Sequence, residues 1–121
     1  MKFSKLELEV KPPSDGRIWR IEFDSSKTNI GVSAAYSMAI EKLTRELSPF
    51  HQVNGGQYNR YKPGLHMWEF WSSPRNDSGF MEKLQALAVR IQSEARRIFE
   101  ENEKYGMNEV LQMEWDKQEG R

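Results

Sequence analysis

A short segment that occurs twice constrains the fold of this chain more than any other feature of its sequence. Residues 22–29 (EFDSSKTN) and residues 69–76 (EFWSSPRN) share a Glu-Phe pair, a Ser-Ser pair and a final Asn. Each copy is followed by a glycine and an apolar residue that begin a helical pattern. We therefore expect an internal duplication with units at about 5–48 and about 57–105, although so few matching letters also arise by chance.

Each unit is predicted to begin with two strands. Polar and apolar residues alternate over 6–10 and 17–24, and the turn-forming residues 12–16 between them favour a hairpin. In the second unit, strands are expected at 57–61 and 65–71. The side chains expected on the buried face of the first hairpin are Trp19, Ile21 and Phe23.

A helix is predicted to end each unit, because apolar residues recur at spacings of three and four. Pro49 ends the first helix, and Gly106 caps the second after about Tyr105. Residues 107–115 are expected to form a last strand. The two apolar stripes are Val32, Tyr36, Ala39, Leu43 and Leu47, and Phe80, Leu84, Leu87, Ile91 and Ala95.

These elements predict an α+β fold: an antiparallel sheet with two helices on one face, built from tandem ββα units plus a C-terminal strand. A chain of 121 residues is too short for two independent cores, so residues 1–121 are expected to form a single domain. Ile98, Phe99 and Tyr105 lie on a long polar helix end and need a cover, for which a homodimer is the simplest source.

Composition excludes several classes of function. Eighteen Lys and Arg balance eighteen Asp and Glu, so no net field draws the chain to nucleic acid or to acidic lipid. Without cysteine there is no disulfide framework and no thiolate nucleophile, and two histidines make a metal site improbable. No cofactor is expected. The charged N-terminus and the lack of an apolar run predict a cytoplasmic protein with no membrane partner.

The repeated Ser-Ser-x-x-Asn hinge before each helix has two interpretations. Amide groups in the first turn of a helix bind phosphate, and the same amides are satisfied by ordinary Ser or Asn caps. Capping is favoured, since neither copy carries a glycine-rich phosphate motif. The candidate residues are Ser72, Ser73, Arg75 and Asn76, with Ser25, Ser26, Lys27 and Asn29 as the corresponding set of the first copy.

Aromatic and basic residues alternate through the second hairpin. Tyr58, Arg60, Lys62 and Trp71 combine rings that stack on bases with cations that meet phosphates. We therefore predict a non-enzymatic binding protein that engages a nucleotide or single-stranded nucleic acid. The same residue types anchor protein interfaces, so the alternative is a protein-interaction module, an inhibitor or adaptor of a macromolecular machine. For an enzyme, the plausible acid or base groups are Glu22, Glu69 and His66.

Overall fold

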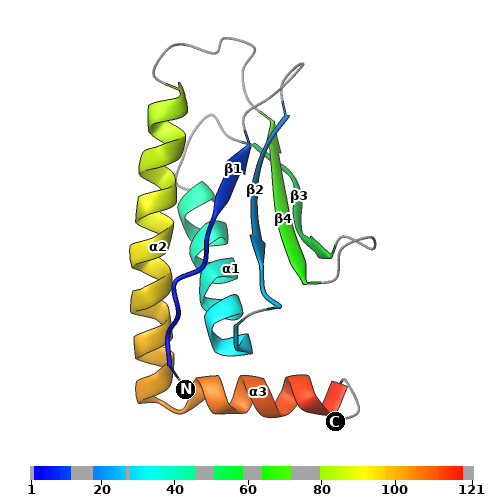
Figure 1. The fold of residues 1–121 in the computed structure, drawn as a ribbon, viewed down its shortest axis with the longest axis vertical. Helices are drawn as coiled ribbons and strands as arrows, with labels where there is room; N and C mark the ends of the chain where they lie inside the picture. The colour runs from blue at the N-terminus through cyan, green and yellow to red at the C-terminus, as the bar shows by residue number, and fades with distance from the viewer. Residues whose placement is uncertain are drawn as a thin grey trace.

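The computed structural model describes residues 2–11, 18–26, 28–45, 51–58, 64–71 and 80–118. For 51–58, 71, 80, 81 and 84 the backbone alone is described. The protein is α+β, with an antiparallel sheet and three helices (Figure 1). Its elements are β1 (Glu9–Lys11), β2 (Ile18–Asp24), α1 (Ile30–Arg45), β3 (His51–Tyr58), β4 (Leu65–Trp71), α2 (Phe80–Lys104) and α3 (Met107–Gln118).

Three longer strands and the short edge strand β1 form the sheet in the order β1-β2-β4-β3, and all neighbours are antiparallel. The first two strands pair as the alternation predicts. In the centre, β2 and β4 pair over their full lengths of seven residues. This register places three pairs on one face of the sheet: Trp19 opposite Phe70, Ile21 opposite Trp68, and Phe23 opposite His66.

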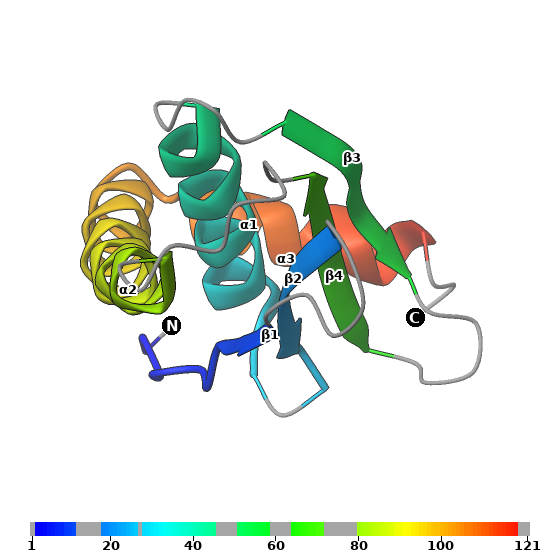
Figure 2. The same cartoon turned by 90° about the horizontal axis from the view of Figure 1, so that it is seen from above.

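One apolar core joins this face to the helices. The predicted buried positions of β2 are confirmed, and so are the described members of both helical stripes. The members are Val32, Tyr36, Ala39 and Leu43 on α1 and Leu87, Ile91 and Ala95 on α2. Figure 2 shows α1 next to α2, with α3 crossing the end of α1. Leu47, Phe80 and Leu84 lie outside the described side chains.

The predicted C-terminal strand is wrong, because residues 107–118 form α3. Gly106 has a φ of 71°, so it ends α2 as predicted, and the chain then turns into another helix instead of a strand. Met, Leu, Glu, Gln and Lys, which are strong helix formers, make up most of this segment. Leu111 and Trp115, four residues apart, are both half-buried, which is the spacing of one helical face.

Two strand boundaries also differ from the prediction. The third strand, described from His51 to Tyr58, begins six residues before the predicted start at 57 and includes the Asn54-Gly55-Gly56 segment, whereas residues 59–61 lie outside the described residues. The register between β3 and β4 shifts on both sides of Asn54, and an edge strand tolerates such bulges and the glycines within them. β1 is shorter than residues 6–10, and of the predicted turn 62–64 only Gly64, with a φ of 90°, is described.

The duplication is not decided by this architecture. Strand, strand and helix follow each other twice along the chain, but a common origin of the two units and a shared sheet face for both helices stay predictions. The argument for a homodimer loses part of its basis, because Ile98 and Phe99 are buried within the chain. Phe3 packs on Phe99 with 5.5 Å between ring centroids, so the N-terminal segment supplies this cover. Tyr105 remains 70% exposed.

Across the described part of the chain, none of the helices is both long and apolar enough to span a lipid bilayer.

A close contact between α1 and α3 fixes the C-terminal helix. Asn108 is fully buried, and its Nδ2 donates to the Phe99 carbonyl at 3.2 Å and to a Glu103 carboxylate oxygen at 2.7 Å. Within the described part of the chain its Oδ1 has no hydrogen-bond partner, and it faces Gly31 in the first turn of α1. A Cβ at position 31 would lie 2.8 Å from that oxygen. Glycine is therefore required for the two helices to approach.

Gly31→Ala is expected to lower the free energy of unfolding by about 1–3 kcal/mol, because the added methyl overpacks this contact. Urea denaturation of the parent protein, Gly31→Ala, Asn108→Ala and the double variant measures these free energies of unfolding. The double variant should be more stable than the sum of the single effects implies, by a coupling of about 1 kcal/mol. Additive effects of the two substitutions would show that the added methyl group at position 31 does not meet Asn108.

A charged cluster links α1 to α2. Glu94 accepts hydrogen bonds from Lys42 of α1 at 2.8 Å and from Arg97 at 2.6 Å. These two donors hold the pKa of Glu94 down at about 2, with the Arg97 hydrogen bond as the larger cause. Because its folded pKa lies below the unfolded value, Glu94 stabilises the fold above about pH 4.5, and this contribution is lost as the pH falls through about 2.

Glu94→Gln is expected to reduce the stability at pH 7 by roughly 1 kcal/mol, since both cations are half exposed and screened by water. The difference from the parent protein should shrink as the pH is lowered from about 5 to 2. Thermal unfolding at each pH gives the comparison, with the exposed Glu114→Gln as the control. A stability difference between Glu94→Gln and the parent protein that does not depend on pH would contradict the low pKa of Glu94.

Candidate functional site

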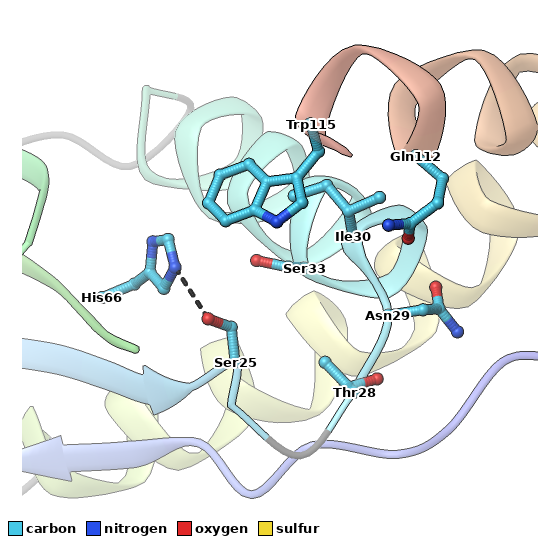
Figure 3. Close-up of a pocket in the computed structure, with 8 residues that line it drawn as sticks. All are labelled: Ser25, Thr28, Asn29, Ile30, Ser33, His66, Gln112 and Trp115. Carbon is cyan, nitrogen blue, oxygen red and sulfur yellow. Dashed lines mark hydrogen bonds between the residues drawn. The ribbon is translucent and has the colours of Figure 1, made fainter. Parts of the chain in front are cut away.

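A small pocket lies where the end of β2, the start of α1, the start of β4 and α3 meet (Figure 3). Its volume is about 140 Å³. We call it the hinge pocket, because the Ser-Ser hinge of the first unit forms one wall. It is lined by Ser25, Thr28, Asn29, Ile30, Ser33, His66, Gln112 and Trp115.

Ser25 connects β2 to the turn before β4. Its backbone N–H and its hydroxyl both donate to the carbonyl of Gly64, at 2.9 and 3.1 Å. The same hydroxyl lies 3.0 Å from Nε2 of His66. A serine hydroxyl has one proton, and both the Gly64 carbonyl and Nε2 of His66 lie within its reach, so the direction of the second contact follows the tautomer of the ring. The contact positions the imidazole beside the hinge.

His66 lies on the aromatic face of the sheet, as the repeat alignment predicts. Its ring stacks on Phe23 with 5.0 Å between centroids and an interplanar angle of 10°. Burial lowers the pKa of the imidazole, and the nearby Asp24 carboxylate opposes this effect in part. The imidazole is therefore held toward its neutral form.

Asn29 caps helix α1. Its Oδ1 accepts the backbone N–H of Val32 at 3.0 Å, and its Nδ2 donates to the carbonyl of Lys2. This is the favoured interpretation of the hinge, and it occupies an amide that a phosphate would need. Ser26 is exposed, and its backbone N–H is bound by Asp24. Lys27 lies outside the described residues.

Three lining groups keep free hydrogen-bonding capacity. Ser33 is 4% exposed, and its hydroxyl makes no hydrogen bond within the described part of the chain. Figure 3 shows its oxygen directed into the space between Ser25 and Trp115. Gln112 donates from Nε2 to Asp116, which leaves its carbonyl oxygen. The indole N–H of the half-buried Trp115 also has no partner among the described residues.

Of the residues predicted for the second hairpin, the structure describes only the backbones of Tyr58 and Trp71, which lie at opposite ends of β4. The backbone of Tyr58 pairs with His66 beside the hinge pocket, whereas the backbone of Trp71 pairs with Ile18 at the other end of β4. Five residues separate His66 from Trp71, which corresponds to roughly 17 Å along a strand. Outside the described residues lie Arg60, Lys62, Ser72, Ser73, Arg75 and Asn76.

The paired acids Glu22 and Glu69 lie on the sheet face opposite the aromatic pairs. Arg20 is directly opposite Glu69 and contacts the carboxylates of both acids, at 3.9 Å from Glu22 and 3.6 Å from Glu69. Glu22 is 5% exposed and also meets Lys11 at 3.2 Å. These acids and cations together form a structural ion-pair network.

Sequence reasoning missed half of the hinge pocket. Gln112 and Trp115 belong to the segment that was predicted as a strand. A strand would have placed these two side chains elsewhere in the fold. The detectable signal was the helical spacing of Leu111 and Trp115 beyond the Gly106 cap. Ser33 was not among the predicted site residues. Within the described residues, His, Asp and Glu side chains nowhere gather in a group of three that suits a metal ion.

Comparison of the chain with protein-family models, with curated proteins and with solved structures finds no match. The function is therefore argued from the geometry of the hinge pocket and from its surroundings.

The pKa of His66 is expected to lie below 6.5, because burial disfavours the charged ring. Asp24→Asn should lower it further by removing the opposing carboxylate. Since the folded pKa is depressed, His66 should reduce the stability as the pH falls from 6.5 toward that value. An NMR titration, with His51→Gln to assign the signals, measures the pKa, and a value at or above 6.5 would refute the burial argument.

Proposed function

We propose that the protein is a small non-enzymatic binding protein that engages a nucleotide or single-stranded nucleic acid. The single observation that carries this proposal is the hinge pocket, which combines an indole ring with unsatisfied polar groups. Bases in single strands are held by stacking on aromatic side chains and by hydrogen bonds to their edges. Trp115, Ser33 and Gln112 provide these two kinds of contact.

The position of the basic residues supports the same proposal. Arg60 and Lys62 belong to the connection between β3 and β4, and both ends of this connection are anchored beside the hinge pocket. Tyr58 pairs with His66 at one end, and Gly64 is bound to Ser25 at the other. Cations are the groups that the phosphates flanking a bound base require. Trp71, Ser72, Ser73, Arg75 and Asn76, at and after the end of β4 in the sequence, stay part of the proposed binding residues.

A protein-interaction module is the second candidate, and the outer side of α3 favours it. Met107, Val110 and Met113 recur every three residues and are exposed by 46%, 49% and 70%. Together with the neighbouring Tyr105, they form an apolar ridge beside the hinge pocket. Exposed apolar rows of this kind are common in interfaces. In this alternative, the same end of the molecule would contact another protein. A second copy of this chain is one such protein, and it would form a homodimer through the ridge.

The function is tested with a fluorescently labelled single-stranded oligonucleotide of mixed sequence, about ten nucleotides long, by anisotropy at two salt concentrations. Binding should weaken as salt rises, and Arg60→Gln with Lys62→Gln should reduce the salt dependence by about one unit of log-log slope per residue. Nucleoside monophosphates, followed by NMR at millimolar concentration, extend the test to single nucleotides.

The matched control is Arg45→Gln with Lys83→Gln, which removes the same number of cations. Both of these side chains are exposed, and they lie at the end of α1 and the start of α2, far from the hinge pocket (Figure 1). This variant should bind like the parent protein. No salt-sensitive binding to any oligonucleotide or nucleotide would refute the proposal and favour the interaction module.

A further inference from the structure

We infer that the hinge pocket accepts a single six-membered base ring, and that the protein therefore prefers pyrimidine nucleotides to purine nucleotides. This inference rests on the proposed function and assigns a ligand class to the same pocket. Its basis is the pocket's volume, the charge of its lining and the hydrogen bonds that the lining leaves unmade.

The volume of the pocket matches one ring. The pocket measures about 140 Å³, and an apolar protein cavity of about 150 Å³ holds one benzene molecule. A pyrimidine ring is of the same size class as benzene, whereas a purine adds a fused five-membered ring. The walls resist expansion on two sides, because Ser33 lies in the buried face of α1 and His66 is stacked on Phe23.

The lining favours a neutral ligand over a phosphate. Lys and Arg are not among the described side chains that line the pocket, and burial keeps His66 toward its neutral form. Asp24 adds negative charge near the imidazole. The cap by Asn29 also removes the amide of Val32 from the anion-binding groups of α1. A phosphate would therefore lose its hydration here without gaining a cation.

The unsatisfied groups match the edge of a pyrimidine. Ser33 can both donate and accept, and the Gln112 carbonyl accepts, while the Trp115 ring is left to stack on the base. Uracil and thymine present two carbonyl acceptors around one N–H donor, and cytosine presents an amino donor beside two acceptors. Either edge can satisfy a donor and an acceptor of the lining at once. The remaining polar groups, those of Ser25, Thr28 and Asn29, are already bonded within the protein.

The test compares oligo(dT), oligo(dC) and oligo(dA) of equal length in the same anisotropy assay. The parent protein should bind the pyrimidine strands at least about fivefold tighter than oligo(dA). Ser33→Val fills the pocket and removes its buried hydroxyl, so this preference should fall to less than twofold. Ser37→Val makes the same exchange one turn further along α1, away from the hinge pocket, and should keep the preference.

Gln112→Ala is a second variant that spares the core, since its side chain is half-buried and bonds Asp116. It should also reduce the preference by several-fold. Equal binding of all three strands, or a preference that survives in Ser33→Val and Gln112→Ala, would overturn the pyrimidine pocket and leave the proposed function intact. Failure of every strand to bind would instead refute the proposed function itself.

Discussion

The pairing of β2 with β4 through large aromatic side chains is the constraint on which the rest of this structure depends. Trp19 and Phe70 stack with 4.5 Å between their centroids, and Phe23 and Trp68 lie 5.6 Å apart. Such pairs contribute about 0.5–1.5 kcal/mol each beyond the area they bury. A shift of one residue would turn every ring to the other face, so the register is strongly specified. That register places His66 beside Phe23 and next to Ser25, and the hinge pocket follows from it.

The second requirement is the closure of the pocket by α3. This helix reaches the start of α1 because Gly31 leaves room for the buried Asn108, which ties the turn after α2 to the core. The contact leaves Oδ1 of Asn108 without a partner among the described residues, and such a buried group costs on the order of 1–3 kcal/mol. The fold tolerates this cost in order to bring Gln112 and Trp115 over the hinge. Two elements distant in sequence thereby complete one site.

The two clusters of charged side chains lie away from the hinge pocket. The paired acids of the opposite sheet face are neutralised by Arg20 and Lys11, and the cluster around Glu94 fastens α1 to α2. Near the hinge, a half-buried imidazole, hydroxyls and an amide form the lining, and no Lys or Arg is among the described residues of the pocket. This division is the physical basis for the proposal of a ligand whose ring is neutral.

Much of the local architecture was predictable from the sequence, because it depends on neighbouring residues. Alternation identified β2 and β4, the spacing of apolar residues identified α1 and α2, and Gly106 marked the end of α2. The prediction failed where tertiary contacts decide: β3 accommodates its glycines through bulges against β4, and the last segment becomes a helix that Asn108 docks onto α1. By itself the sequence determined the aromatic sheet face, with His66 along it. Only the tertiary structure decided that Ser33, Gln112 and Trp115 surround the hinge, since these residues meet through packing across the fold and no local pattern encodes that meeting.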